Sequence, residues 1–161
     1  MFAPVSVLQI LKIDLKGETQ KPMTAMPDSS ASSRLSAPII LLGRFLFALL
    51  FLMASFNHLS GKLTAFAASQ GVPAASILVP ASGVVALLGG LSILLGYRAR
   101  LGGWLIALFL VGVTPMHKFW GIADPMLQQT QMIMFMKNIS MLGGALLISQ
   151  FGSGPWSIDN R

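Results

Sequence analysis

Four long apolar segments limit what this chain can fold into. They cover residues 38–59, 74–95, 100–116 and 131–151, and each falls in the range of about 17–25 residues that an α-helix needs to cross a bilayer. Charged residues make up only 10% of the chain, whereas soluble domains usually carry about a quarter. The pattern therefore predicts an all-α fold, an antiparallel four-helix transmembrane bundle with lipid as its solvent.

The segments around this bundle have a different composition. Residues 1–36 contain prolines and a serine-rich run, which is typical of a flexible N-terminal tail. Residues 37–151 form the expected transmembrane domain, and residues 152–161 a C-terminal tail. Because the first 25 residues resemble neither a signal peptide nor a membrane span, we also expect that Met26 is the natural start.

The positions of lysine and arginine predict the orientation of the helices. One side of the expected membrane domain carries seven basic residues, and the other carries two. The first set is Lys12, Lys16, Lys21, Arg34, Arg98, Arg100 and Arg161, and the second is Lys62 and Lys118. Since cytoplasmic loops are enriched in Lys and Arg, both termini should be cytoplasmic.

Six residues follow one another at alternating spacings of four and three, along the first apolar segment and just past its end. They are Arg44, Ala48, Phe51, Ser55, His58 and Lys62. Such spacing places residues on one face of a helix, so we expect this face to point into the bundle. Gln131, Met134, Asn138, Met141 and Ala145 share a face of the fourth segment in the same way.

Two cations, Arg44 and Lys137, lie within segments that contain no acidic residue. Charges inside a membrane are expensive and usually need a partner. Arg44 lies near the cytoplasmic end, where reaching toward lipid phosphate is the favoured interpretation and a structural role the alternative. For Lys137 two interpretations stay open: a structural contact with water, Asp124 or free carbonyls, or a buried cationic site for an anionic or quinone-like ligand.

His58, His117 and Trp120 gather at the predicted outer face. The histidines fit interfacial hydrogen bonding, a proton-handling role beside a quinone head group, or least readily a haem or metal site. Only Asp124 offers a further ligand type nearby, so no metal is predicted. Trp120 fits an interface anchor, or alternatively a stacking surface for a flat ligand.

Several function classes lack the residues that they need. The chain has no cysteine, which excludes disulfides, thiolate metal sites and a dithiol relay within it. Clustered arginines with interleaved aromatics are missing, so no nucleic-acid partner is predicted. No serine or threonine has a histidine–acid partner in its sequence context, which argues against a hydrolase.

The order of several short motifs resembles that of DoxX-like membrane proteins. They lie within residues 39–159, at 43–44, 68–73, 89–90, 95–96, 117–120, 136–139 and 152–159. The resemblance implies a four-helix bundle in a bacterial cytoplasmic (inner) membrane, and some relatives are linked to quinone-coupled sulfur oxidation. Relatives often carry a glutamate where this chain has Ala86, and a lysine near His58.

The leading hypothesis is an integral inner-membrane subunit that binds a quinone or another amphipathic anion. The expected pocket consists of His58, Lys62, His117, Trp120, Lys137 and Asn138. Quinone is then the candidate cofactor, electrons come from a redox partner protein, and a homo-oligomer is compatible with the sequence. The alternative is a non-catalytic membrane scaffold or assembly factor, so whether the chain is an enzyme is left open.

Overall fold

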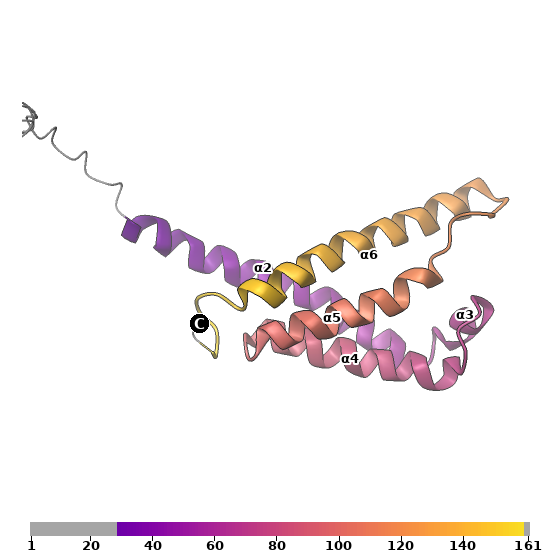
Figure 1. The fold of residues 1–161 in the computed structure, drawn as a ribbon, viewed down its shortest axis with the longest axis horizontal. Helices are drawn as coiled ribbons and strands as arrows, with labels where there is room; N and C mark the ends of the chain where they lie inside the picture. The colour runs from indigo at the N-terminus through magenta and orange to yellow at the C-terminus, as the bar shows by residue number, and fades with distance from the viewer. Residues whose placement is uncertain (1–28, 160–161) are drawn as a thin grey trace, which may run out of the picture. The chain divides into compact units, whose positions relative to one another are not determined.

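A computed structural model describes residues 29–159 of the chain, with side chains from residue 37 onward. Its main elements are four long helices, α2 (Ser29–Leu59), α4 (Ala75–Leu95), α5 (Ala99–Val113) and α6 (Pro125–Phe151). A short helix α3 (Thr64–Ser69) and a 3₁₀ turn η1 (Thr114–Met116) complete them (Figure 1). Residues 29–159 contain no strand, so the predicted all-α fold is confirmed. Residues from Leu35 onward form one compact unit.

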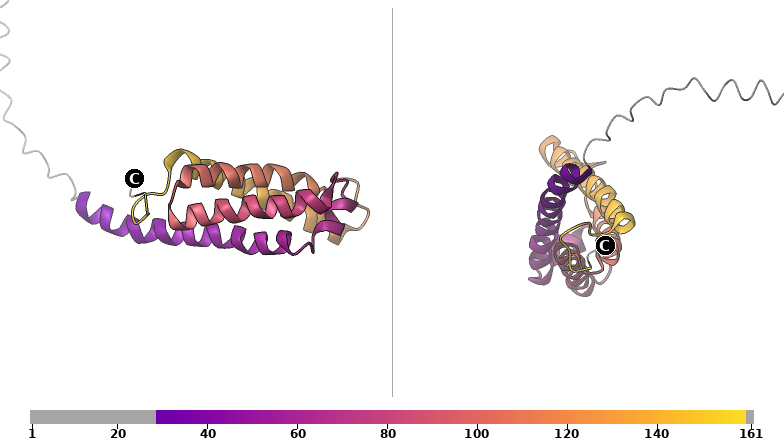
Figure 2. Two further views of the ribbon diagram at one scale, coloured as in Figure 1. Left: turned by 90° about the horizontal axis from the view of Figure 1, so that it is seen from below. Right: turned by 90° about the vertical axis from the view of Figure 1, so that its left-hand side faces the viewer.

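The four long helices lie side by side and alternate in direction (Figure 2). α4 packs against α5 and α5 against α6, while Phe47 of α2 contacts Gly144 of α6. We call the end that carries α3 and residues 117–124 the histidine end. The opposite end, with the α4–α5 connection and the end of α6, is called the turn end. This arrangement places residues from all four helices at each end of the bundle.

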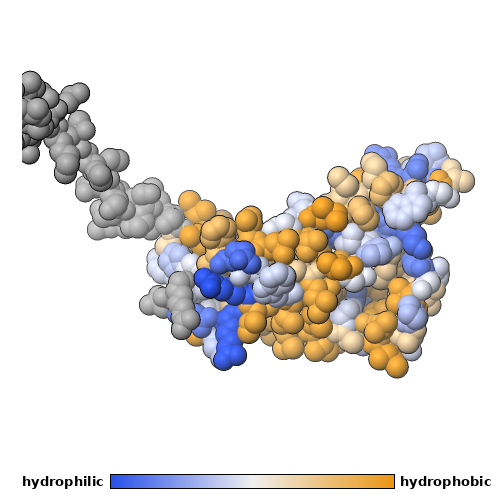
Figure 3. Space-filling view, in the orientation of Figure 1, coloured by the Kyte–Doolittle hydropathy of each residue, from blue (hydrophilic) through white to orange (hydrophobic). Residues whose placement is uncertain are grey.

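The helices have the length and composition of membrane spans. Four stretches qualify, Ala37–Leu59, Ala75–Leu95, Ala99–Met116 and Pro125–Phe151. Figure 3 shows hydrophobic residues over the middle of the bundle and hydrophilic residues at both ends, which is the distribution that a bilayer requires. Leu46 and Met53 of α2 are 57% and 61% exposed, as expected of side chains that face lipid. The protein is therefore a multi-pass membrane protein.

The face predicted to point inward from α2 does so. Arg44, Ala48, Phe51, Ser55 and His58 are all buried. Phe51 forms the core with Ile106, Leu110 and neighbouring aliphatic side chains. Since lipid is as apolar as leucine, close packing rather than burial from water stabilises such a core.

Glycine permits a close approach between α5 and α6. A Cβ on Gly103 would lie 2.7 Å from the backbone nitrogen of Ser149 and 2.8 Å from the carbonyl oxygen of Ala145. Real Cβ atoms do not come this close to backbone, so only glycine fits here. The α5–α6 separation is set by this contact, as is common where small residues let membrane helices meet.

The fourth helix begins earlier than predicted. We expected it to start at about residue 131, but α6 starts at Pro125. Asp124 is its N-cap, and the carboxylate accepts a hydrogen bond from the Met126 nitrogen at 2.9 Å. An acidic N-cap followed by proline at the first helical position is a helix-start signal, and it carries the polar residues 128–131 into the helix.

The first helix also extends into the segment that was expected to be a tail. α2 starts at Ser29, whereas residues 1–36 were predicted to be flexible. The rest of that segment, including the proposed start at Met26, lies outside the described residues. The second and third spans agree with the predicted 74–95 and 100–116 to within a residue.

The C-terminal tail folds back over the turn end. Its Ile158 nitrogen donates to the Leu95 carbonyl and its Asp159 nitrogen to the Gly96 carbonyl, both at 3.2 Å. The Asp159 carboxylate accepts a hydrogen bond from the backbone nitrogen of Arg98. The tail is thereby attached to the connection between α4 and α5.

Arg44 attaches the same tail to the first helix. Its Nη1 donates to the Ser153 carbonyl at 3.1 Å and its Nη2 to the Trp156 carbonyl at 2.6 Å. The residue is only 6% exposed. We expected the guanidinium to reach lipid phosphate or else to have a structural role, and the structure turns it inward onto the tail. We call this arrangement the arginine latch.

Candidate functional site

A cavity at the histidine end contains four of the six residues predicted to bind a ligand. His58, His117, Lys137 and Asn138 all line it, and its volume is about 160 Å³. They come from α2, the segment after η1, and α6. Phe66, Phe109 and Met141 add apolar wall. The bundle thus brings together polar residues that are far apart in the sequence, in what we call the histidine-end cavity.

His58 is held by a hydrogen bond to the neighbouring helix. Its Nδ1 lies 2.8 Å from the hydroxyl oxygen of Ser82, and that hydroxyl donates its one hydrogen to the Val79 carbonyl at 2.7 Å. Ser82 therefore accepts from His58, which places the hydrogen on Nδ1. In the neutral imidazole Nε2 is then the nitrogen with a lone pair, and it is free to accept a proton or a hydrogen bond.

His117 has a similar arrangement. Its Nδ1 lies 2.9 Å from the side-chain oxygen of Gln131, an acceptor, so Nδ1 carries hydrogen here too. The ring lies beside Phe66, with 6.3 Å between the ring centroids. Both histidines are thus fixed through Nδ1, and both line the histidine-end cavity.

Asn138 is the most informative residue of the cavity. It is 95% buried, since its exposed fraction is 5%, and its side chain forms no hydrogen bond to residues 37–159. Its amide atoms keep some accessible surface, because the residue lines the cavity. A buried amide normally finds partners, and leaving it without them costs about 1–3 kcal/mol. The cavity is therefore where its hydrogen bonds must be made.

Lys137 adds a positive charge at the rim of the same cavity. Its side chain is exposed, and its Nζ contacts only the Met134 sulfur, at 3.3 Å. Sulfur is a weak acceptor, and no carboxylate within the described part of the chain pairs with this lysine. The structural partner suggested earlier, Asp124, instead caps α6. The ammonium group remains available to an anionic or carbonyl-bearing ligand.

Lys62 and Trp120 do not belong to the cavity lining. Lys62 was included because the helical spacing continued to it, but α2 ends at Leu59 and Gly61 has a φ of +72°. The spacing therefore stops applying before Lys62. Trp120 packs edge-on against Phe119 and Phe135, with ring centroids 5.3 Å and 6.5 Å away.

The arrangement is not that of a protein-only metal site. Among the described side chains, no three histidine, cysteine or acidic residues lie close enough to hold an ion together. What the histidine-end cavity offers is two proton acceptors, one amide and one cation. This set suits hydrogen bonding and charge stabilisation at a flat polar group.

An apolar cavity of about 220 Å³ adjoins the first one. It shares His58, Phe109, Val113 and Met116 with it and continues along Val79 and Leu108, between α4 and α5. The rings of two shared residues, His58 and Phe109, lie with 5.2 Å between their centroids. Together the two volumes fall in the range of about 300–1,000 Å³ usual for small-molecule sites.

A comparison with protein families decides which family this is. The model of the DoxX family matches residues 39–120, which is half of the chain. The chain belongs to the DoxX family. The match in this DoxX-family protein includes His58 and His117 but ends before Lys137 and Asn138. Neither the curated proteins nor the solved structures include a match to it.

Some residues of the site escaped the sequence analysis as functional positions. Gln131 was placed on one face of the fourth segment, but neither Gln131 nor Ser82 was recognised as the partner of a histidine. Their positions on inward faces were the only available signal. Phe66 and Phe109 carried no signal beyond their aromatic character. Ala86, where relatives often have glutamate, is fully buried in the core.

Proposed function

We propose that this DoxX-family protein binds a quinone head group, or another amphipathic anion, in the histidine-end cavity. It would act as a subunit of a redox system in a bacterial inner membrane, with both termini in the cytoplasm. The observation that carries the proposal is Asn138, a buried amide that lines this cavity and has no hydrogen-bond partner in residues 37–159. The positive-inside pattern of lysine and arginine supports the orientation.

Each residue of the cavity has a distinct role in this proposal. The Asn138 amide donates a directional hydrogen bond to a ring oxygen, and Lys137 stabilises negative charge on the reduced ligand. When a quinol is oxidised to the quinone, two electrons pass to the partner protein and two protons are released, and the free Nε2 of His58 or His117 accepts one of these protons. The isoprenoid or acyl part lies in the adjoining apolar cavity along Val79 and Leu108.

The fit of a quinone rests on the donor set and on the shape of the two cavities. A ring oxygen needs a hydrogen-bond donor, and Asn138 and Lys137 supply donors on adjacent residues. Trp120 was the expected stacking surface, but Phe66 and Phe109 border the cavity instead. Because the chain has no cysteine for a dithiol relay, a partner protein exchanges electrons with the ligand in this proposal.

Replacing Lys137 by methionine tests the charge. We expect Lys137→Met to weaken binding of a soluble ubiquinone analogue by about tenfold or more, because hydrogen bonds to charged groups contribute roughly 1.5–3 kcal/mol. Binding is measured by titration of the purified protein in detergent. Lys118→Met is the matched control, since Lys118 is exposed at the same end and does not line the cavity. Equal affinity in Lys137→Met and wild type would show that the pocket hypothesis is wrong.

Replacing Asn138 by leucine tests whether the amide serves a ligand or the fold. We expect Asn138→Leu to leave the ligand-free protein as stable as wild type, or stabilise it by about 1 kcal/mol, because a buried polar group without a partner is removed. Binding of the same quinone analogue should fall at least fivefold. The thermal unfolding of the ligand-free protein and its titration with the quinone analogue are measured on the same preparation of each variant. A clear loss of stability with unchanged binding contradicts the proposal.

A non-catalytic scaffold or assembly role is the second candidate. The aromatic cluster of Phe119, Trp120 and Phe135 favours it, because Trp120 is 59% exposed at the histidine end and offers a contact surface. Under this alternative, Lys137→Met impairs folding or recovery of a partner protein and no quinone analogue binds wild type. Under the ligand proposal, expression and partner recovery are unchanged in that variant.

A further inference from the structure

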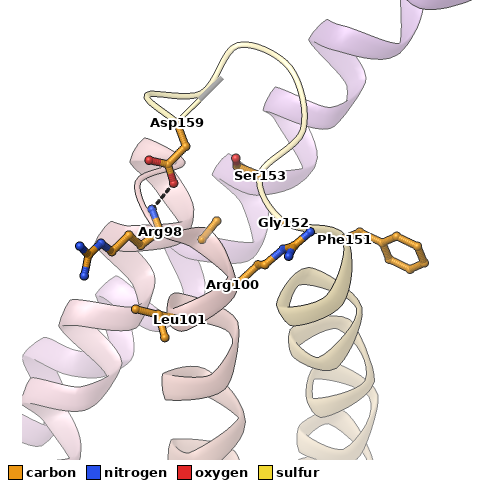
Figure 4. Close-up of a pocket in the computed structure, with 8 residues that line it drawn as sticks. Arg98, Arg100, Leu101, Phe151, Gly152, Ser153 and Asp159 are labelled. Atoms are coloured by element: carbon orange, nitrogen blue, oxygen red, sulfur yellow. Dashed lines mark hydrogen bonds between the residues drawn. The ribbon is translucent and has the colours of Figure 1, made fainter. Parts of the chain in front are cut away.

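A second polar cavity lies at the turn end, far from the histidines in the bundle. It has a volume of about 460 Å³ and lies between the start of α5, the end of α6 and the C-terminal tail. Arg98 precedes α5 and Arg100 belongs to its first turn, and Ser153 and Asp159 come from the tail (Figure 4). We call it the basic pocket. It is larger than the histidine-end cavity, and the proposed function does not use it.

The charges around the basic pocket are not balanced. Neither guanidinium is paired with a carboxylate among residues 37–159, and Arg98 only borders the Tyr97 ring, 5.8 Å from its centroid. The one acid of the lining, Asp159, accepts a hydrogen bond from the Arg98 backbone nitrogen. Arg44 adds a third cation directly behind Ser153. The excess positive charge calls for an anion.

The two arginines flank the pocket from different sides. Figure 4 shows Arg100 extending from α5 toward Gly152 at the end of α6, whereas the Arg98 side chain points to the other side of the α5 start. A Cβ on Gly152 would lie 3.5 Å from the Arg100 Nε, so the guanidinium group runs along a residue without a side chain. Arg100 therefore supplies the direct contact, and Arg98 supplies charge at the mouth.

The surroundings of the pocket are those of a lipid interface. Leu101 and Phe151 belong to its lining and are 54% and 78% exposed. In Figure 4 the Phe151 ring points away from the pocket, off the side of α6. An anion held here therefore has apolar surface next to it. Basic pockets between membrane helices at such a level suit the head groups of anionic lipids.

We propose that the basic pocket binds the phosphate group of an anionic phospholipid. Arg100 donates to the phosphate oxygens in the forked geometry for which arginine is suited, and Arg98 adds charge. The acyl chains lie against Leu101 and Phe151. A soluble phosphate would present the same group to the same arginines, but it would gain nothing from the apolar surface.

The test compares two lipids that share their acyl chains and phosphate diester but differ in net head-group charge, and it adds inorganic phosphate as a third probe. Purified full-length protein in a neutral detergent is titrated with dioctanoyl phosphatidylglycerol, dioctanoyl phosphatidylcholine or sodium phosphate, and thermal unfolding is followed by tryptophan fluorescence. At a concentration a few times Kd, we expect phosphatidylglycerol to raise Tm by about 2–4 °C. Phosphatidylcholine and sodium phosphate should give no comparable rise.

The variants assign this effect to the pocket. Arg98→Gln/Arg100→Gln should weaken phosphatidylglycerol binding about thirtyfold, and Arg100→Gln alone about fivefold, since each basic residue near anionic lipid contributes about a factor of five. Arg98 has a φ of +48°, a left-handed backbone conformation that a substitution could disturb. Arg100→Gln leaves Arg98 in place, so this single variant tests the pocket even if the double variant does not fold. Lys62→Gln/Lys118→Gln removes the same charge at the histidine end and is the matched control.

The outcomes separate the sources of the phosphate. If sodium phosphate raises Tm as much as phosphatidylglycerol and the arginine variants lose both effects, the pocket binds phosphate and its source is soluble. If wild type responds equally to both lipids, or the Arg100→Gln variant binds phosphatidylglycerol as tightly as wild type, the proposal is overturned. A loss in the lysine control equal to that in the arginine double variant also overturns it.

Discussion

Replacing Gly103 by valine is expected to disrupt the packing of α5 on α6. The first carbon of any side chain here would lie 2.7 Å from the Ser149 backbone nitrogen, and neither backbone can rotate away as a side chain would. The helices must therefore separate, and the contacts of Ala145 and Ala107 in the core loosen with them. Overpacking usually costs about 1–3 kcal/mol, and we expect about 3 kcal/mol or more because backbone is displaced.

The measurement is thermal unfolding of the purified protein in detergent, where a loss of this size lowers Tm by about 6–12 °C. Gly112→Val is the matched control on the same helix, since a Cβ on Gly112 meets nothing within 4 Å. This control also replaces a glycine of α5 by valine, so it measures the change in helix propensity alone. If both variants unfold at one temperature, the close approach of α5 and α6 does not stabilise the bundle.

Replacing Arg44 by methionine is expected to release the C-terminal tail. The variant removes both hydrogen bonds of the arginine latch, to the Ser153 and Trp156 carbonyls. Hydrogen bonds to charged groups contribute about 1.5–3 kcal/mol each. Part of this is offset, because the buried Arg44 Nε has no partner within the described residues and its desolvation cost disappears. We expect a net loss of roughly 2–4 kcal/mol.

Hydrogen exchange of the tail amides reports this release directly. The Ile158 and Asp159 nitrogens, bonded to the carbonyls of Leu95 and Gly96, should exchange at least tenfold faster in Arg44→Met than in wild type. Arg44→Lys keeps the positive charge, but a lysine ammonium group lacks the two spaced nitrogens with which the guanidinium binds both carbonyls. The tail amides of this variant should therefore exchange at an intermediate rate. Protection equal to wild type in the methionine variant would show that the latch does not hold the tail.

Much of the fold could be predicted because hydropathy and helical spacing determine it. The inward face of α2 followed from residues three and four apart, and Arg44 to His58 are buried along it. The start of α6 was missed because residues 128–130 are polar and were assigned to a loop. The Asp124–Pro125 pair contained the signal, and a membrane helix that extends past the lipid can carry polar residues there.

The candidate site was predictable only where periodicity placed a residue. His58 and Asn138 lie on inward faces, so their approach could be expected from the bundle. Lys62 was placed on such a face by a spacing that ends with the helix at Leu59. Trp120 lies in a loop, where no period applies. The partners of Arg44 are backbone carbonyls, which every residue possesses, so no sequence pattern could identify them.

The arginine latch has a consequence for how the protein is made. Arg44 belongs to the first segment that a translocon would pass to the membrane, whereas its carbonyl partners at Ser153 and Trp156 are synthesised more than a hundred residues later. Throughout translation of the intervening helices this guanidinium lacks its final acceptors. Assembly of the nascent bundle is therefore completed only once residues 153–156 have been made, and a fusion partner that prevents them from folding back would leave this span with an unsatisfied cation.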